Sequence, residues 1–414
     1  MLGGKESAST ILGLTKFLAE IGVTDIYLSL GLPLFVRYRT EVRPAHEAVA
    51  HYLEQARSPG SRVNLPEGIE EVIAYLKEND VSFARDYIGY IARNMWLLYK
   101  VDPSFITPLF SYRAMDLGMT LEQGYRARIH AFFSQFPHEI PNNELAVADF
   151  LAKTSMNEEA WYAFASYIRF VIRIIPPIPN SIGELGLHPA LEEQFLSQKG
   201  LYLVTGPTSS GKSTTLAYLV RRASARLPWH IVTLEDPIEY LIPSGPMAGT
   251  RGIVHQREKG RDFRSFPEAM MQALRESPDA IVVGEIRDVD TLNWSIFLAE
   301  AGFTVLATYH TASFPDTVHR IVNSFPEEQQ GMVRARLARV LRATVSQRLV
   351  RAASGMRLVY EYVPVNEAIA SSIEKREYDS YSTPYPWEAS INALVSQGEI
   401  GKEEAITLRA MVGA

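Results

Sequence analysis

The chain has 414 residues, and the usual size of protein domains predicts two or three domains, each able to bury a core of its own. Apolar residues make up 47% and charged residues 21%, a balance typical of a folded protein and not of a disordered one. The absence of cysteine excludes disulfides, thiolate catalysis and cysteine-ligated metal sites, and a formal charge of −6 argues against a dedicated nucleic-acid-binding protein.

The N-terminal region predicts a small mixed α/β domain. It begins MLGGKESAST, without a basic stretch and apolar core, and no window of eighteen residues is uniformly apolar, so we expect a cytoplasmic protein that spans no membrane. Apolar spacing predicts a helix over Ser9 to Ile21 and a mostly helical insertion over 45–118. Strand-forming runs lie at 25–29, 34–39, 125–133 and 170–175. We assign residues 1–175 to this domain.

The C-terminal region predicts a larger α/β core. Three prolines in IPPIPN (175–180) favour an extended connector, and we assign residues 176–190 to a linker. Apolar strands then alternate with helical stretches, which is the pattern of a parallel sheet wrapped by helices. The expected strands are 201–205, 230–235, 280–285 and 304–309. We expect this core over 191–365, closed by an Arg-rich helix over 327–349, and a helical region over 366–414.

The first core strand runs directly into a sequence of the form G-x-x-x-x-G-K-[ST]. Its glycines allow consecutive backbone N–H groups and the N-terminus of the next helix to face the phosphates of a nucleotide. Lys212 is expected to reach the β- and γ-phosphates, and Ser213 to hold Mg²⁺. A simple glycine turn is the alternative. The expected nucleotide-binding residues are Gly206, Pro207, Thr208, Ser209, Ser210, Gly211, Lys212, Ser213 and Thr214.

Acidic residues follow two further strands. Glu285 ends a buried apolar strand, at the edge where open α/β sheets bind ligands, and is expected to bind Mg²⁺ through water. Hydrolysis needs a carboxylate that orients and deprotonates water, and Glu239 is the first candidate, with Glu235 second. Strand termination and turn capping are the structural alternatives for these acids.

His310 ends the fourth strand in the sequence Ala-Thr-Tyr-His-Thr. A lone histidine is often a hydrogen-bonded core residue, and the alternative here is a ligand or sensor of the γ-phosphate. Four strand ends therefore converge on one edge of the expected sheet. This convergence, more than any single motif, indicates an ATPase.

These segments, in this order, resemble the PilT-type secretion and pilus ATPases, a family that includes retraction motors, type II secretion ATPases and the DotB/TraJ motors of conjugation-related type IVB systems. The resemblance covers residues 201–326 through GPTSSGKSTT, TLEDPIEY, HQRE, ALRESPDAIVVGEIRD, ATYHTAS and RIVNSFP. VTDIYLSLGLPLFVRY, RARIHAFF and FVIRIIP resemble strands of the family's N-terminal lobe.

The resemblance implies a PAS-like α+β N-terminal domain carrying the insertion, a RecA-like P-loop ATPase core, and a homohexamer that uses ATP and Mg²⁺. It also implies an inner-membrane platform protein as partner, and a location at the inner face of the cytoplasmic membrane. Arginines of the N-terminal lobe that reach the nucleotide correspond to Arg126, Arg128 and Arg173. Phosphate contacts or intersubunit pairs are implied for Arg257 and Arg275, with Arg261 and Arg264 nearby.

Some residues depart from the family pattern. Ser209 stands where glycine is usual, and the segment between Tyr240 and Gln256 is longer than usual. The chain lacks the four-cysteine zinc element of assembly-type ATPases, which favours the retraction or DotB/TraJ branches. The stretch AIASSIE (368–374) lacks the Arg and Asn of the retraction signature AIRNLIR, so conjugative transfer or type IVB secretion is a rival function.

Two other functional hypotheses are compatible with the same fold. A RecA-like nucleic-acid translocase is favoured only by the arginines between Arg334 and Arg351, and the acidic net charge argues against nucleic acid as a direct substrate. A silent regulator that binds ATP without hydrolysing it is disfavoured, because the residues expected to serve hydrolysis are all present: Lys212, Ser213, Glu239, Glu285 and His310.

Overall fold

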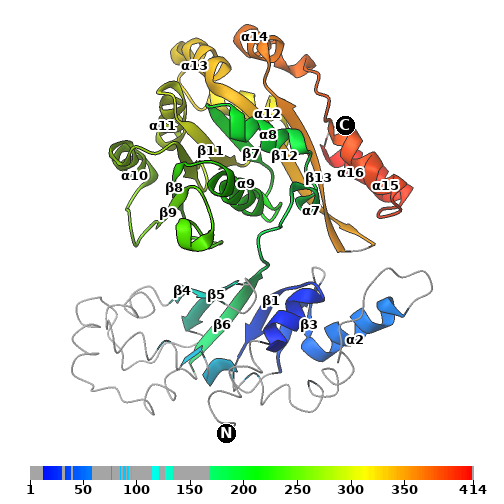
Figure 1. The fold of residues 1–414 in the computed structure, drawn as a ribbon. Helices are drawn as coiled ribbons and strands as arrows, with labels where there is room; N and C mark the ends of the chain where they lie inside the picture. Colours follow the sequence, from blue (N-terminus) through cyan, green and yellow to red (C-terminus); the bar gives the residue numbers. More distant parts are fainter. Residues whose placement is uncertain are drawn as a thin grey trace, which may run out of the picture. The chain divides into compact units, whose positions relative to one another are not determined.

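A computed structural model of the chain divides into two compact units, Met1–Pro177 and Ile178–Ala414, each built around its own sheet (Figure 1). It describes residues 13–29, 33–38, 41–57, 114–120, 126–133, 167–353 and 355–412, with single helical positions between 76 and 95. The predicted insertion over 45–118 lies largely outside these residues. Its described ends are helix α2 (Ala45–Ala56) and strand β4 (Ala114–Thr120).

The N-terminal unit contains an antiparallel sheet with the order β3-β2-β1-β6-β5-β4. The other strands are β1 (Val23–Leu28), β2 (Phe35–Tyr38), β3 (Glu41–Pro44), β5 (Arg126–Phe133) and β6 (Ile168–Ile175). Alternate residues of β5 are buried, which is the pattern of a sheet with one face on the core. Ala127, Ile129 and Ala131 therefore lie in the core, while Arg126 and Arg128 lie on the opposite face.

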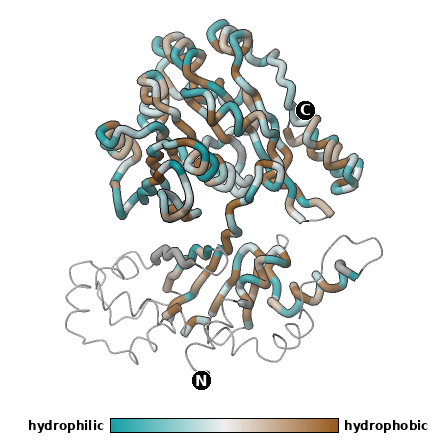
Figure 2. The backbone as a smooth tube through the Cα atoms, in the orientation of Figure 1, coloured by the Kyte–Doolittle hydropathy of each residue, from teal (hydrophilic) through white to brown (hydrophobic). Residues whose placement is uncertain are grey.

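The C-terminal unit contains a seven-stranded sheet with the order β13-β12-β7-β11-β10-β8-β9. All neighbours from β12 to β9 are parallel, and β13 is antiparallel to β12. The strands are β7 (Leu201–Thr205), β8 (His230–Glu235), β9 (Ile253–Glu258), β10 (Ala280–Val283), β11 (Thr304–Tyr309), β12 (Leu341–Ala352) and β13 (Gly355–Pro364). The central strands are buried along their whole length, and Figure 2 shows hydrophobic residues concentrated along them.

Helices cover this parallel sheet (Figure 1). They are α7 (Ile182–Leu185), α8 (Pro189–Ser197), α9 (Lys212–Arg226), α10 (Phe266–Ala273), α11 (Val289–Glu300), α12 (Phe314–Asn323), α13 (Glu327–Val340), α14 (Glu367–Lys375), α15 (Trp387–Ser396) and α16 (Lys402–Val412), with 3₁₀ turns η3 (Pro246–Ala248), η4 (Leu274–Glu276) and η5 (Tyr378–Ser380). Among the residues described, none of the helices has the length and apolar character needed to cross a membrane.

The predicted fold class is confirmed: a mixed α/β chain in which a smaller α+β domain precedes a RecA-like core with a largely parallel sheet. The expected strands at 201–205, 230–235 and 304–309 have the predicted bounds. Strand β9 was not predicted, because its sequence IVHQRE is polar at the exposed edge of the sheet. The extended connector is shorter than predicted, since helix α7 begins at Ile182 after its N-cap Ser181.

The prediction of one Arg-rich helix over 327–349 is wrong. Helix α13 ends at Val340, and Leu341 begins strand β12, which pairs in parallel with β7. The run LRATVSQRLV has β-branched residues at Thr344, Val345 and Val350, and burial beside β7 outweighs the helical propensity of its arginines.

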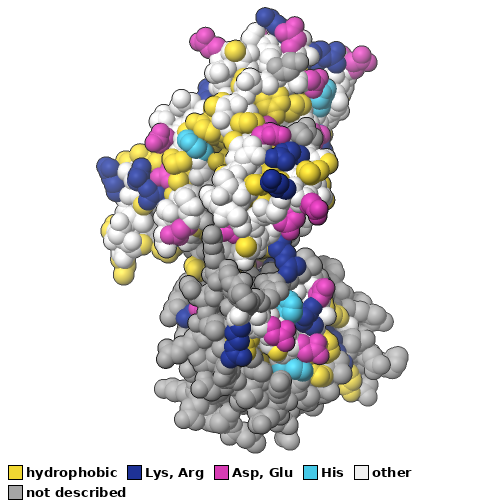
Figure 3. Space-filling view, turned by 90° about the vertical axis from the view of Figure 1, so that its right-hand side faces the viewer, with side chains coloured by type: hydrophobic (Ala, Val, Ile, Leu, Met, Phe, Trp, Pro, Cys, Tyr) yellow, Lys and Arg dark blue, Asp and Glu magenta, His cyan; other side chains and the backbone are white. Residues whose placement is uncertain are grey.

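Two of the arginines in this segment have partners within the unit. Arg336 donates to both oxygens of Glu300 at 3.0–3.1 Å and to Asn293 at 3.0 Å, and Arg342 donates to the Lys199 carbonyl at 2.9 Å. Figure 3 shows acidic and basic side chains interspersed over the visible face of the described residues. The predicted basic helix is therefore shorter than expected: Arg334, Arg336 and Arg339 lie on α13, whereas Arg342, Arg348 and Arg351 lie on strand β12.

Truncation of Phe314 tests the core. Its side chain is fully buried at the start of α12, with its ring 5.0 Å from that of Tyr381. We expect Phe314→Ala to lower the free energy of unfolding by about 3–5 kcal/mol, because it removes buried apolar area and leaves a cavity. Urea unfolding measures this loss. Phe297→Ala, at a side chain that is 44% exposed on α11, is the matched control with an expected loss below about 1 kcal/mol, and equal losses would contradict the packing described here.

Candidate active site

The predicted site segments follow four strands that are neighbours in the sheet. Strand β11 pairs in parallel with β7 and β10, and β10 pairs in parallel with β8. Because parallel strands end at the same edge, their carboxyl ends lie side by side. The residues found at these ends are Gly206, His310, Glu285 and Glu235.

The loop between β7 and α9 is held by close backbone contacts. Gly206 has φ of 145° and Gly211 has φ of 89°, values that L side chains rarely adopt. A Cβ atom at Gly206 would lie 2.2 Å from the Gln347 carbonyl oxygen and 2.6 Å from Ser210 Oγ. Glycine is therefore required here by contact with β12 as well as by φ. Ser209 has φ of 62°, so serine occupies a left-handed position where the family usually has glycine.

Lys212 is the first residue of α9, and its ammonium group lies inside this loop. It is 8% exposed and donates to the carbonyl oxygens of Gly206 and Pro207 at 2.9 and 2.7 Å. Burial lowers the pKa of Lys212, while the charges of Glu285 and Glu239 act to raise it. Ser210 Oγ is buried without a hydrogen-bond partner among the described residues. A confined cation and an unsatisfied hydroxyl fit a loop that receives phosphate oxygens.

Glu285 is held between two basic side chains. One carboxylate oxygen pairs with Arg287, and the other lies 3.6 Å from His310 Nε2. Burial lowers the pKa of His310, and the charge of Lys212 lowers it further, whereas Glu285 acts in the opposite direction. The lowered pKa of His310 favours the neutral imidazole. Arg287 had no predicted role, although it lies within the GEIRD motif.

Glu239 is positioned by anchored residues on both sides of it. The Ile238 amide donates to Glu258 Oε2 at 2.9 Å, and the Tyr240 hydroxyl lies 2.8 Å from Thr214 Oγ1 at the start of α9. Glu239 itself is half-buried, and its charge acts on Lys212. These contacts fix the backbone around Glu239 against the N-terminus of α9.

Glu235 has structural partners on β8 and β9. Its Oε1 accepts from Thr233 Oγ1 at 2.6 Å and from Gln256 Nε2 at 2.9 Å, and Gln256 also donates to the Tyr240 carbonyl. Burial raises the pKa of Glu235. The carboxylate thus ties β8 to β9 and to the segment that carries Glu239.

Gln347 of β12 was missed by the sequence analysis because that segment was assigned to a helix. Its side chain is 1% exposed, donates to the Ser210 carbonyl at 2.8 Å and accepts from Thr215 Oγ1 at 3.0 Å. Gln347 therefore supports the loop and the first turn of α9 together. The β-branched residues Thr344, Val345 and Val350 around this glutamine were the signal that the segment forms a strand.

The predicted arginines of the N-terminal unit lie on one face of its sheet. Arg126 and Arg128 share a face of β5, and Arg173 stands directly opposite Arg128 on β6. Arg173 also donates to Asp25 Oδ1 at 3.1 Å. The sheet thus brings these three arginines together within their own unit.

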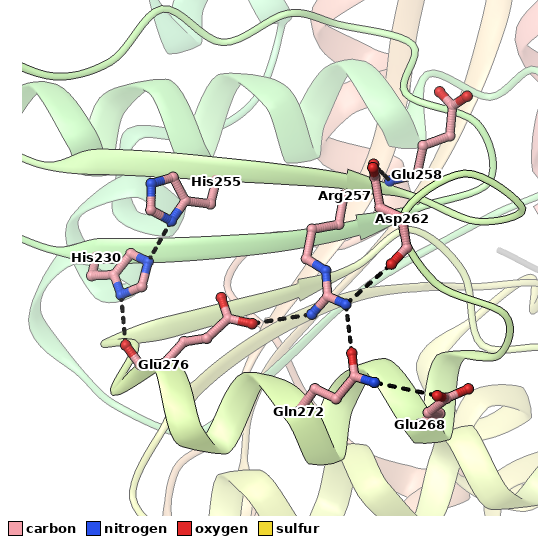
Figure 4. Close-up of polar contacts among 8 residues, drawn as sticks. All are labelled: His230, His255, Arg257, Glu258, Asp262, Glu268, Gln272 and Glu276. Atoms are coloured by element: carbon pink, nitrogen blue, oxygen red, sulfur yellow. Dashed lines mark hydrogen bonds and ion pairs between the residues drawn. The ribbon is translucent and has the colours of Figure 1, made fainter.

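The predicted arginines of the core have different environments. Arg257 donates to Glu276 Oε1 at 3.1 Å and to Gln272 Oε1 at 2.6 Å, and Figure 4 shows it between β9 and α10. Arg275, Arg261 and Arg264 are exposed. Arg257 therefore has a structural role within the unit, which sequence alone did not separate from a phosphate contact.

These features define a two-domain protein with a RecA-like α/β core. The sequence profile of the family described as "Type II/IV secretion system protein" matches residues 163–382, more than half of the chain. The chain belongs to this family. The resemblance to PilT-type ATPases that the motifs indicated is thereby confirmed.

Comparison with individual relatives and solved structures also shows similarity to pilus and secretion ATPases. The chain is 37% identical over 245 residues to the type IV pilus retraction ATPase PilT of Pseudomonas aeruginosa, covering 57% of this chain and 70% of that protein. A crystal structure of the pilus retraction motor PilT with bound ADP superposes with a TM-score of 0.65 and 28% identity, covering 96% of both chains. The ATPase DotB of Yersinia pseudotuberculosis superposes with a TM-score of 0.66, covering 98% of this chain and 94% of its own, and its 22% identity shows the fold alone.

Replacement of Gln347 tests its support of the loop. Gln347→Leu leaves the Ser210 carbonyl and Thr215 Oγ1 unpaired in a buried place, and we expect the free energy of unfolding to fall by about 2 kcal/mol or more. Urea unfolding measures this change. Arg348→Leu, at the next and half-exposed position, is the control with little expected effect. Equal stability of Gln347→Leu and the parent would show that the loop does not depend on this contact.

Replacement of Glu235 tests the origin of its raised pKa. Above that pKa the native state carries a buried charge, so Glu235→Gln is expected to raise the melting temperature at neutral pH while its amide oxygen still accepts from Thr233. The advantage should shrink as pH falls through the raised pKa and vanish below the ordinary glutamate pKa of about 4.3.

Thermal unfolding across this pH range measures the effect, with the exposed Glu268→Gln as control. A lower melting temperature of Glu235→Gln at neutral pH would mean that the ionised carboxylate stabilises the fold.

Proposed function

We propose that this chain is a motor ATPase that hydrolyses ATP to ADP and phosphate and uses the energy to drive type IV pilus dynamics or type II/IV secretion. One observation supports this proposal most strongly. The Lys212 loop, the Glu285–His310 pair and the Glu239 segment lie together at one edge of four adjacent parallel strands. Family membership and the likeness to an ADP-bound pilus motor support ATP as the nucleotide.

The residues present fit a magnesium ion. Ser213 is exposed at the start of α9, Glu285 offers a carboxylate beside the strand end, and oxygen atoms are the ligands that Mg²⁺ prefers. We propose that Ser213 holds the ion directly and Glu285 through water. When bound, Mg²⁺ supplies charge stabilisation at the phosphate oxygens.

We assign the chemical steps to the side chains as follows. The Lys212 ammonium moves from the loop carbonyls to the β- and γ-phosphates, where it offsets the charge that develops during transfer. Glu239 orients the attacking water and accepts its proton, and Glu235 is the second candidate. Neutral His310 forms a hydrogen bond with the γ-phosphate. Because its Nε2 lies 3.6 Å from Glu285, binding of the γ-phosphate at His310 also affects Glu285.

The proposed assembly is a homohexamer at the cytoplasmic face of the inner membrane, where it acts on a platform protein. Arg126 and Arg128 are placed on the sheet face opposite the N-terminal core, and we propose that they reach a nucleotide bound by a core domain of the ring. Arginine suits this task because it stabilises charge on the phosphoryl oxygens.

A second candidate is a DotB/TraJ-like ATPase of conjugative transfer or type IVB secretion. It is favoured by α14, where the stretch 368–374 carries no arginine although the retraction signature AIRNLIR has two. Nucleic acid is not proposed as a direct substrate, because Arg336 and Arg342 of the presumed basic helix are bound within the core.

Turnover of purified protein with Mg·ATP tests the site. We expect Lys212→Ala to lower kcat at least about 100-fold, because it removes a preorganised charge, and Glu239→Gln to lower it about 100- to 10,000-fold. Phosphate release is the measurement. Lys199→Ala, at an exposed lysine after α8, and Glu235→Gln are matched controls expected to retain most turnover. Parental rates in Lys212→Ala would refute the site, and loss only in Glu235→Gln would exchange the two candidate bases.

A further inference from the structure

A cluster of metal-ligating side chains lies on strands β8 and β9 and turn η4, away from the carboxyl ends of the strands and the proposed nucleotide site. His230 begins β8, His255 lies within β9, and Glu276 ends η4 after α10. One ligand atom from each residue lies within 4.8 Å of the ligand atoms of the other two. Among the described residues, these three form the group whose spacing would allow them to hold a metal ion. Figure 4 shows the two imidazoles facing one another beside Glu276.

Strand register places the two histidines on one face of the sheet. His255 stands opposite Val232, two residues along β8 from His230. Side chains two residues apart point to the same face, and diagonal neighbours are within reach of long side chains. His230 Nε2 and His255 Nδ1 are 3.1 Å apart. Two ligands at about 2.0–2.1 Å from a tetrahedral zinc ion are about 3.3–3.4 Å apart, so the pair has nearly the required spacing.

The surroundings match those of a metal-binding histidine. His230 Nδ1 lies 3.0 Å from the Glu276 carbonyl oxygen. A ligating histidine commonly donates its second ring N–H to a backbone carbonyl, which fixes the tautomer and leaves Nε2 unprotonated for the metal. The His230 backbone is also fixed, because its amide donates to Asp279 Oδ2 at 3.0 Å and its carbonyl accepts from the Asp279 amide at 2.8 Å.

Glu276 supplies the third ligand. Arg257 donates to its Oε1 at 3.1 Å, which leaves Oε2 for a metal, and its side chain is 33% exposed. His255 is exposed on edge strand β9, so a metal ion has a path from solvent and water can complete the coordination. Two imidazoles and one carboxylate are a known zinc ligand set.

We propose that His230, His255 and Glu276 bind a divalent transition-metal ion, with Zn²⁺ as the best match. The ion fastens the exposed strand β9 to β8 and to the end of α10. It thereby stabilises the two strands whose opposite ends carry Glu235 and Glu258. Cysteine is absent from the whole chain, so any tight zinc site must use nitrogen and oxygen ligands.

Zinc titration of the untagged, chelator-treated full chain tests the site. Calorimetry is expected to give one Zn²⁺ per chain, and saturating Zn²⁺ at about 100 times its Kd should raise the melting temperature by about 5 °C or more. His255→Asn removes a ligand from an exposed strand and should weaken binding at least about 100-fold, and it should abolish the thermal shift. Glu276→Gln provides a second variant with the same expected direction.

The control is His310→Asn, which removes the histidine beside Glu285 and should leave zinc affinity unchanged. Loss of binding in His310→Asn with retention in His255→Asn would overturn the proposal, because the ion would then occupy the Glu285 site. Equal zinc affinity of His255→Asn and the parent, or absence of stoichiometric binding at about 100 μM Zn²⁺, would overturn it as well.

Discussion

The close approach of Gly206 to strand β12 is the constraint on which the proposed site depends. The Gln347 carbonyl lies where a Cβ atom of residue 206 would be, and the Gln347 side chain bonds the loop carbonyl of Ser210 and the hydroxyl of Thr215. The loop therefore takes its shape from a strand more than a hundred residues later in the chain. Lys212 is confined within that loop, so its charge has a fixed place at the start of α9.

Parallel sheet order assembles the rest of the site around this loop. Strands β7, β11, β10 and β8 are neighbours, so their carboxyl ends bring His310 and Glu285 beside the lysine loop. The acidic residues there differ in environment. Glu235 accepts hydrogen bonds from Thr233 and Gln256 and has a raised pKa, whereas Glu239 lies between anchored neighbours and its charge acts on Lys212. This difference supports Glu239 over Glu235 as the proposed base.

Each unit is stabilised by its own core, and arginines of both units lie at defined places in their folds. Those of the core are used internally: Arg257 joins β9 to α10, and Arg336 joins α13 to α11. Arg126 and Arg128 lie on the non-core face of the N-terminal sheet. The family resemblance implied nucleotide, phosphate or intersubunit contacts for Arg126, Arg128 and Arg257, because the sequence does not show which partner tertiary packing gives an arginine.

The sequence by itself determined the α/β class, the phosphate-loop motif and three of the core strands, because apolar runs and glycine spacing are local signals. Only the tertiary structure decided that residues 341–352 form a strand, that Gln347 supports the loop and that His230 and His255 lie together. Each of these depends on pairing between segments far apart in the chain. The burial of β12 against β7 and the register between β8 and β9 are set by contacts between distant segments. Local propensity does not include the energies of such contacts.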